Sequence, residues 1–177
     1  MRGYFGVGAE RISKPMNLGA ILRTGHAFGA SFAFTLAAHH RARLVNISDT
    51  ARSALHMPLY EWAGVEEMHL PRGCALVGVE LDEDAVDLPS FRHPLNAAYL
   101  FGPEKGDLSS EAKAHCAHLV KIPTKFCVNL SVAAAIVMYD RVLSMGGYPA
   151  RPARTGGPPP VSDWRPLSSR ARRRREG

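Results

Sequence analysis

The sequence contains few cysteines, and their pattern suggests neither a cross-link nor a metal site. Only Cys74, Cys116 and Cys127 occur in 177 residues. An odd number without a C-x-x-C pair argues against both a disulfide framework and a cysteine zinc site. The histidines give no metal pattern either, because His115 and His118, which are three residues apart, have no carboxylate cluster beside them. We therefore expect no metal, and a reducing compartment, the cytoplasm, for the protein.

Long hydrophobic runs are also missing. No apolar run approaches the roughly 20 residues that span a bilayer. The N-terminal sequence MRGYFGV lacks the long apolar region and small-residue cleavage site of a secretion signal. Hydrophobic residues nevertheless make up 46% of the chain, which is typical of a globular protein. We expect no membrane association.

The body of the chain has no excess charge of either sign. Of the 22 basic and 16 acidic residues, eight arginines and two acids lie in residues 151–177, which leaves 14 of each kind in the first 150. The net charge of +6 therefore belongs to this last segment, which is rich in proline, glycine, serine and arginine. We predict one domain over residues 1–150 and a basic, mostly disordered tail over residues 151–177. The tail either adds phosphate contacts or is only a solvated terminus.

Short apolar runs alternate with helix-like segments along the body. The predicted strands are residues 4–7, 31–36, 75–81, 97–101 and 119–122, and the predicted helices are residues 18–28, 110–116 and 130–145. Several of the strands are continuously apolar, which is typical of strands covered on both faces. The pattern predicts an α/β fold with a mainly parallel sheet and helices on both faces.

The last predicted helix is apolar nearly all the way round as far as Tyr139. Such a helix must be buried on more than one side. Either the sheet covers one side and a second subunit the other, or the helix lies in the core of a monomer. The sequence favours neither.

The first motif is NLGAILRTGHAFGA, residues 17–30. Asn17 follows Pro15 closely, and we expect it to cap the start of a helix. Arg23 is the one strong cation in this segment. Taken alone, it is better explained as an ordinary surface arginine.

The second motif is YLFGPEKGDLSSE, residues 99–111, where a buried strand ends at Gly102. Ligands of parallel sheets bind beyond the carboxyl ends of strands, where glycine lets the backbone come close. The plain alternative is a strand-to-helix turn, with Ser109 or Ser110 as the helix cap. The spacing is not that of a phosphate-binding P-loop.

The third motif is VKIPTKFCVNLSVAAA, residues 120–135. A strand ends near Ile122, and Asn129 precedes the apolar helix. On its own Asn129 is best explained as a helix cap.

Together, and in this order, the three motifs resemble the SpoU (TrmH) branch of the SPOUT superfamily of RNA methyltransferases. The resemblance rests on an Asn-x-Gly-x-x-x-Arg helix, an F-G-x-E turn, and an I-P loop leading into N-L-S-V-A-A-A, and it covers residues 3–147. The compact size is most similar to the minimal, TrmL/YibK-like members, which methylate the wobble ribose of tRNA.

The resemblance implies a C-terminal deep trefoil knot, a homodimer, and transfer of a methyl group from S-adenosylmethionine to a ribose 2′-hydroxyl of RNA, with tRNA favoured over rRNA. It implies catalytic roles for four residues: Asn17, Arg23, Glu104 and Asn129. The cofactor-binding residues that it implies are Glu80, Leu81, Gly102, Ile122, Val128 and Ala133. Since a guanidinium keeps its charge at pH 7, we expect Arg23 to grip a phosphate and stabilise the developing alkoxide rather than to act as a simple base.

Two positions depart from the family pattern. Cys127 stands where the family usually has serine, and Asp107 stands where it usually has glycine, which has moved to Gly106. A thiol is a weaker hydrogen-bonding group than a hydroxyl. Two alternatives therefore stay open: a base-nitrogen methyltransferase, and a knotted RNA-binding protein without turnover.

Overall fold

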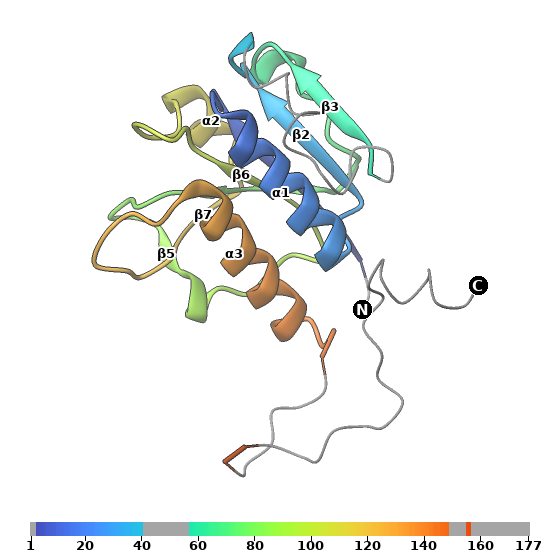
Figure 1. Ribbon diagram of the computed structural model, residues 1–177, viewed down its shortest axis with the longest axis vertical. Coiled ribbons are helices and arrows are strands. Elements are labelled where there is room, and N and C mark those ends of the chain that lie inside the picture. Colours follow the sequence, from blue (N-terminus) through green and yellow to red (C-terminus); the bar gives the residue numbers. More distant parts are fainter. Residues whose placement is uncertain (1–2, 41–56, 149–154, 157–177) are drawn as a thin grey trace, which may run out of the picture.

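A single parallel sheet organises the chain. The computed structural model describes residues 3–40, 57–148 and 155–156. Within them seven strands form one sheet in the order β3-β2-β1-β6-β4-β7-β5, and every neighbouring pair is parallel (Figure 1). The strands are β1 (Tyr4–Glu10), β2 (Phe32–Leu36), β3 (Leu59–Trp62), β4 (Ala75–Val79), β5 (Val86–Asp87), β6 (Asn96–Phe101) and β7 (His118–Lys121). The predicted parallel α/β architecture is confirmed.

Helices cover both faces of this sheet, as predicted. They are α1 (Pro15–Phe28), α2 (Ser110–His115) and α3 (Leu130–Ser144), with short 3₁₀ turns η3 (Val65–Glu67) and η4 (Leu88–Ser90). Figure 1 shows α1 and α3 side by side over one face. A hydrophobic cluster joins these two helices to strand residues such as Phe5 and Tyr99. The predicted tail lies outside the described residues except for positions 155 and 156.

The opposite face carries a second cluster, which α2 and η3 cover. Phe32 and Phe34 of β2 are buried in it beside Leu100 of β6. Glycines in β1 make room for these rings, because a Cβ at Gly6 or Gly8 would lie 2.3 or 2.6 Å from Phe32 or Phe34. The run of glycines in β1 is therefore explained by packing within the sheet.

The start of α1 differs from the prediction. The helix begins at Pro15, with Lys14 as its N-cap residue, so the expectation that Asn17 caps the helix is wrong. Proline is favoured in the first turn because its fixed φ suits the helix and it has no N–H to satisfy. Asn17 lies inside that turn, nearly buried, and its side chain makes other contacts.

The start of α3 agrees with the prediction. Asn129 is its N-cap, and its Oδ1 accepts a hydrogen bond of 2.9 Å from the Ser131 N–H. Ala134, Val137 and Met138 are buried, whereas Val132 and Tyr139 remain 47% and 45% exposed. The possibility that α3 lies wholly in the core of a monomer is therefore wrong.

An arginine anchors the far end of α3. Arg141 is fully buried, and its guanidinium donates to the carbonyls of Tyr4, Pro94 and Leu95 at 2.7–3.1 Å and to the Tyr99 hydroxyl at 3.1 Å. Burial raises the pKa of Tyr99 to about 12, so its hydroxyl stays neutral and accepts this bond. Arg141 thus ties α3 to the amino ends of β1 and β6, remote from the edge where those strands end.

Candidate functional site

A cavity of about 320 Å³ lies at the carboxyl edge of the sheet. Its size falls in the range of small-molecule sites. The ends of β4 and β6, the loop after β7, and the starts of α1 and α3 form its walls. All the residues predicted for the site line this cavity except Arg23; they are Asn17, Glu80, Leu81, Gly102, Glu104, Ile122, Val128, Asn129 and Ala133.

Gly102 is the first residue after β6, at the cavity wall. A Cβ at this position would lie 3.2 Å from both Glu80 Oε2 and the Leu108 backbone nitrogen. Those two atoms are themselves hydrogen-bonded at 2.7 Å. The bare backbone at Gly102 therefore allows the turn after β6 to close against the end of β4.

Glu104 holds the start of α1. Its Oε2 accepts bonds from the N–H and hydroxyl of Ser13 at 3.1 and 3.0 Å, and its Oε1 accepts from the Lys14 N–H at 2.9 Å and from Asn17 Nδ2 at 3.1 Å. Partial burial would raise the pKa of Glu104, but these hydrogen bonds outweigh it and lower the pKa below its ordinary value. An ionised carboxylate with both oxygens engaged is a poor proton acceptor, so the geometry gives Glu104 a positioning role.

Two asparagine side chains continue this network across the cavity. Asn129 Nδ2 donates to Asn17 Oδ1 at 3.3 Å, while Asn129 Oδ1 accepts from both the N–H and the hydroxyl of Ser131. Asn17 in turn donates to Glu104. The chain of bonds joins α3, α1 and the turn after β6, and it fixes the direction of both amides.

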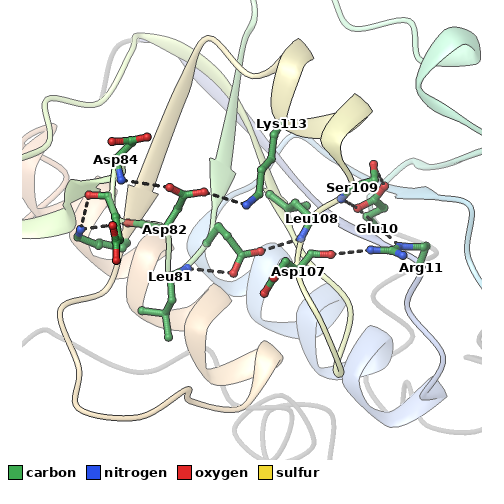
Figure 2. Close-up of polar contacts among 12 residues, drawn as sticks. Glu10, Arg11, Leu81, Asp82, Asp84, Asp107, Leu108, Ser109 and Lys113 are labelled. Atoms are coloured by element: carbon green, nitrogen blue, oxygen red, sulfur yellow. Dashed lines mark hydrogen bonds and ion pairs between the residues drawn. The ribbon is translucent and has the colours of Figure 1, made fainter.

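Two further carboxylates shape the turn that precedes α2. Glu80 Oε2 accepts from the Leu108 N–H at 2.7 Å, and the nearly buried Glu10 accepts from the Ser109 N–H at 2.8 Å and from the Ser109 hydroxyl at 2.5 Å. Figure 2 shows Glu10 beside Ser109 and the Arg11 guanidinium directed at the backbone of Asp107. Glu10 has no sequence signal beyond its place at a strand end, and the sequence analysis missed it.

The engagement of Glu80 bears on its predicted cofactor role. Its Oε1 also accepts a bond of 3.0 Å from the N–H of Leu81, so both carboxylate oxygens bind protein N–H groups.

Ser109 caps α2 by accepting a bond of 3.1 Å from the Ala112 N–H. Of the two predicted cap residues, Ser109 and Ser110, the first is therefore confirmed.

The loop after β4 is fastened separately. Lys113 Nζ lies 2.8 Å from Asp82 Oδ2, and this hydrogen bond lowers the pKa of Asp82 (Figure 2). Lys121 Nζ donates to the carbonyls of Asp82 and Glu83 at 3.0 Å. Both lysines thus hold the wall of the cavity that contains Leu81.

The third loop is more open. Cys127 is exposed and lines the cavity, and the neighbouring Phe126 is 83% exposed. The Thr124 hydroxyl donates to the Phe126 carbonyl at 2.8 Å and so closes a tight turn before Cys127. The thiol therefore stands at the position where the family resemblance places a serine hydroxyl.

Arg23 lies apart from this cavity in its own protomer. It is exposed on α1 and does not line the cavity. Six residues separate it from Asn17, which places it about 9 Å further along the helix and about 120° around it. The structure thus brings three of the four predicted catalytic residues together and leaves Arg23 directed elsewhere.

The described ranges contain neither a metal cluster nor a membrane-spanning helix. No group of three or more His, Cys, Asp or Glu side chains within residues 3–40 and 57–148 is placed to hold a metal ion. Over the same part of the chain, none of the helices has the length and apolarity needed to cross a bilayer.

The geometry agrees with comparisons against known proteins. The model of the SpoU rRNA Methylase family matches residues 5–139. A tRNA (guanosine(18)-2'-O)-methyltransferase from Thermus thermophilus is 32% identical over 142 residues, which are 74% of this chain and 70% of that protein.

Two solved structures share the fold. An AdoMet-bound rRNA methyltransferase from Sinorhizobium meliloti superimposes with a TM-score of 0.72 at 24% identity, covering 81% of this chain and 57% of that one. A structure described in connection with 2-OH methylation of C/U34 on tRNA gives a TM-score of 0.67 at 23% identity, covering 82% of this chain and 99% of that one. This chain thus spans little more than half of the Sinorhizobium protein and nearly all of the second.

Proposed function

This chain belongs to the SpoU rRNA methylase family, and we propose that it transfers a methyl group from S-adenosylmethionine to a ribose 2′-hydroxyl of structured RNA. The observation that carries this proposal is the cavity at the carboxyl edge of β4, β6 and β7, where the three motifs meet. Ligands of parallel sheets bind at this edge.

The residues of the cavity fit the cofactor. Leu81, Ile122, Val128 and Ala133 offer apolar surface for a base, and Gly102 leaves the backbone open. When bound, S-adenosylmethionine supplies an electrophilic methyl group. We assign its binding to these loops, with Glu80 shaping the turn through Leu108 rather than binding the cofactor by its carboxylate.

The polar side chains at the cavity have separable roles in this proposal. Asn17 orients the ribose, because its amide is fixed between Glu104 and Asn129. Glu104 is a positioning residue, since all its contacts are to α1 and the segment before it. Alignment of two reacting groups alone can lower a barrier by several kcal/mol, which is the contribution expected from a fixed amide.

We propose that Arg23 serves the cavity of a partner subunit in a homodimer. Arg23 does not line its own cavity, and the segments that line this cavity also carry exposed apolar side chains: Met16 is 76% exposed, Phe126 83% and Val132 47%. A second subunit would cover these side chains and the outer face of α3. There the guanidinium would grip a substrate phosphate and stabilise the developing alkoxide.

A mixed-dimer experiment tests this arrangement. Arg23→Ala and Asn129→Ala are each expected to be inactive, but mixing them after joint refolding places both lesions in one site and leaves the other intact. Activity should return to about a quarter of wild type, because half of randomly mixed dimers are heterodimers with one good site. If Arg23 acts within its own subunit, the mixture stays inactive and the proposal of a shared site is wrong.

A second test concerns the chemistry of Arg23. Arg23→Lys keeps the charge but loses the planar fork that binds phosphate through two hydrogen bonds. Turnover should fall at least tenfold. Near-normal turnover with unchanged RNA affinity would show that a two-pronged grip is not needed.

Among substrates we favour tRNA over rRNA, and among family members the minimal, wobble-ribose type. The wobble-ribose type is supported by the match to the structure associated with C/U34 methylation, because this chain matches 99% of that protein's length. We also propose the family's C-terminal trefoil knot, for which the position of β4 between β6 and β7 is suggestive. A crystal structure in which the backbone forms no knot between its two ends would contradict this proposal.

The remaining proposals concern the chain's organisation. We propose a methyltransferase domain over residues 1–150 that acts in the cytoplasm, and a basic tail over residues 151–177. The tail's excess of six positive charges beside a neutral body makes it the natural source of long-range attraction for RNA.

A further inference from the structure

A second, smaller hollow lies directly beside the cofactor cavity. It measures about 230 Å³ and shares Lys14, Pro103 and Glu104 with the larger cavity. We call it the cationic notch; its lining is Arg11, Ser13, Lys14, Pro103, Glu104 and Lys105. The methyltransferase mechanism proposed above uses Glu104 but gives no role to the three cations.

The notch concentrates positive charge on an otherwise neutral body. Three cations face one carboxylate there, whereas the first 150 residues hold equal numbers of bases and acids. The single carboxylate, Glu104, is directed at α1 and is already hydrogen-bonded through both oxygens. The notch therefore presents an excess of positive charge to a ligand.

The two lysines of the notch lack the pairing that other lysines at this edge of the sheet have. Lys113 is paired with Asp82, and Lys121 donates to two carbonyls. Over residues 3–40 and 57–148, by contrast, no carboxylate lies within ion-pair distance of the ammonium groups of Lys14 and Lys105. Both side chains are exposed and available to an anion.

The backbone under the notch is held in place. Arg11 has a φ of +49°, a conformation that non-glycine residues seldom adopt, and its guanidinium donates to the Asp107 carbonyl at 2.5 Å. Its Nε also lies 3.8 Å from Glu10, whose carboxylate binds Ser109. The Lys14 N–H is fixed by Glu104. These contacts fix the Arg11 guanidinium and the backbone of Lys14 at the wall of the notch.

From these observations we infer that the cationic notch binds a backbone phosphate of the substrate RNA, next to the nucleotide whose ribose is methylated. This inference rests on the proposed function. A ribose that enters the larger cavity carries phosphates on both sides, and the notch adjoins that cavity through the shared wall of Lys14 and Glu104. Glu104 then couples two tasks, because it orients Asn17 and fixes the backbone of Lys14.

Charge-removing variants of the two lysines test the inference. Lys105→Gln and Lys14→Gln are compared with Arg72→Gln, which removes an exposed cation from the turn before β4, at the opposite edge of the sheet. Binding of an in vitro transcribed tRNA is measured across a range of salt concentrations by the full-length protein. Each notch variant should lower the log-log salt slope by about 0.9 and weaken binding severalfold, whereas Arg72→Gln changes neither or changes both much less.

Two further controls keep the result decisive. Affinity for S-adenosylmethionine should be unchanged in Lys105→Gln, which lies in an exposed turn, so this variant reports on the notch even if Lys14→Gln lowers stability. Lys105→Arg should restore the slope, since it restores the charge. Salt slopes equal to that of wild type in both lysine variants, or a loss equal to that of Arg72→Gln, would overturn the inference.

The outcomes separate the inference from the function on which it rests. If the wild-type protein methylates RNA but the notch variants bind it normally, only the notch is refuted. If the wild-type protein transfers no methyl group to RNA, the proposed function fails, whatever the salt slopes are.

Discussion

Replacing Glu104 by glutamine should loosen the start of α1 and release Asn17. The carboxylate accepts four hydrogen bonds, two on each oxygen, from Ser13, Lys14 and Asn17. Glutamine keeps one acceptor oxygen, and its NH₂ group then faces N–H donors on the other side. At least one backbone N–H loses its partner, and the remaining bonds lose their charge assistance.

The size of the effect follows from these contacts. A hydrogen bond to a charged group contributes about 1.5–3 kcal/mol, and the partial exposure of Glu104 brings the expected loss for Glu104→Gln to about 1–2 kcal/mol. For a chain of this size, that loss corresponds to a fall in Tm of roughly 2–8 °C. Activity should fall further than stability alone explains, because Asn17 is no longer held.

The pH dependence gives this prediction a sign. The folded-state pKa of Glu104 lies below its ordinary value of 4.5, so the stabilisation is fully present above about pH 4.5 and is lost as the pH falls through the folded pKa. The difference in Tm between wild type and Glu104→Gln should be constant near neutral pH and shrink at acidic pH.

Thermal unfolding followed by circular dichroism between pH 3 and pH 8 measures this difference. Glu83→Gln is the matched control, because the Glu83 side chain is exposed. The Tm of this variant should equal that of wild type. An unchanged Tm for Glu104→Gln at pH 7, or a difference that persists undiminished at pH 3, would refute the clamp assigned to Glu104.

Three further changes probe other parts of the account. Gly102→Ala would force a Cβ to within 3.2 Å of Glu80, so affinity for S-adenosylmethionine should drop about tenfold or more by calorimetry, whereas Gly64→Ala, whose Cβ would meet nothing closer than 3.7 Å, should bind normally. Arg141→Met leaves buried carbonyls without donors and should cost about 3–5 kcal/mol in urea unfolding; a loss below 1 kcal/mol would contradict its anchoring role. Deleting residues 151–177 should flatten the salt dependence of RNA binding, and an unaltered slope would show that the arginines do not contact phosphate.

The central strands of the sheet were predictable because their sequences are strongly apolar. Residues 97–101, for example, form the core of β6, which is covered on both faces. The edge strands were missed for a physical reason. β3 has the four-residue sequence LYEW with two exposed residues in its middle, and β5 has only two residues, so neither carries the signal of a buried strand.

The site was predictable in its location and less so in its contacts. Gly102 and Asn129 could be placed from their positions at strand and helix ends. The hydrogen bonds of Glu104 to the segment before α1 could not be predicted, because its partners Ser13 and Lys14 lie about 90 residues away in the chain. The assignment of Asn17 as a cap failed because the helix begins two residues earlier, at Pro15, and the Asn17 side chain binds Glu104, a residue of a distant loop, instead.

The apolar character of the last helix was interpreted correctly only in part. Its inner face packs on the sheet, but Arg141 interrupts it and is buried more completely than most of its neighbours. A charged residue at that position carries no local signal of burial, because its acceptors are carbonyls at strand ends distant in sequence.

The most direct test of the central claim is mass spectrometric analysis of nucleosides from a tRNA transcript incubated with the protein and isotopically labelled S-adenosylmethionine. The account predicts label in a 2′-O-methylated nucleoside, and no such label with Asn17→Ala. Label on a base nitrogen, or none in any nucleoside despite measurable cofactor binding, would contradict it.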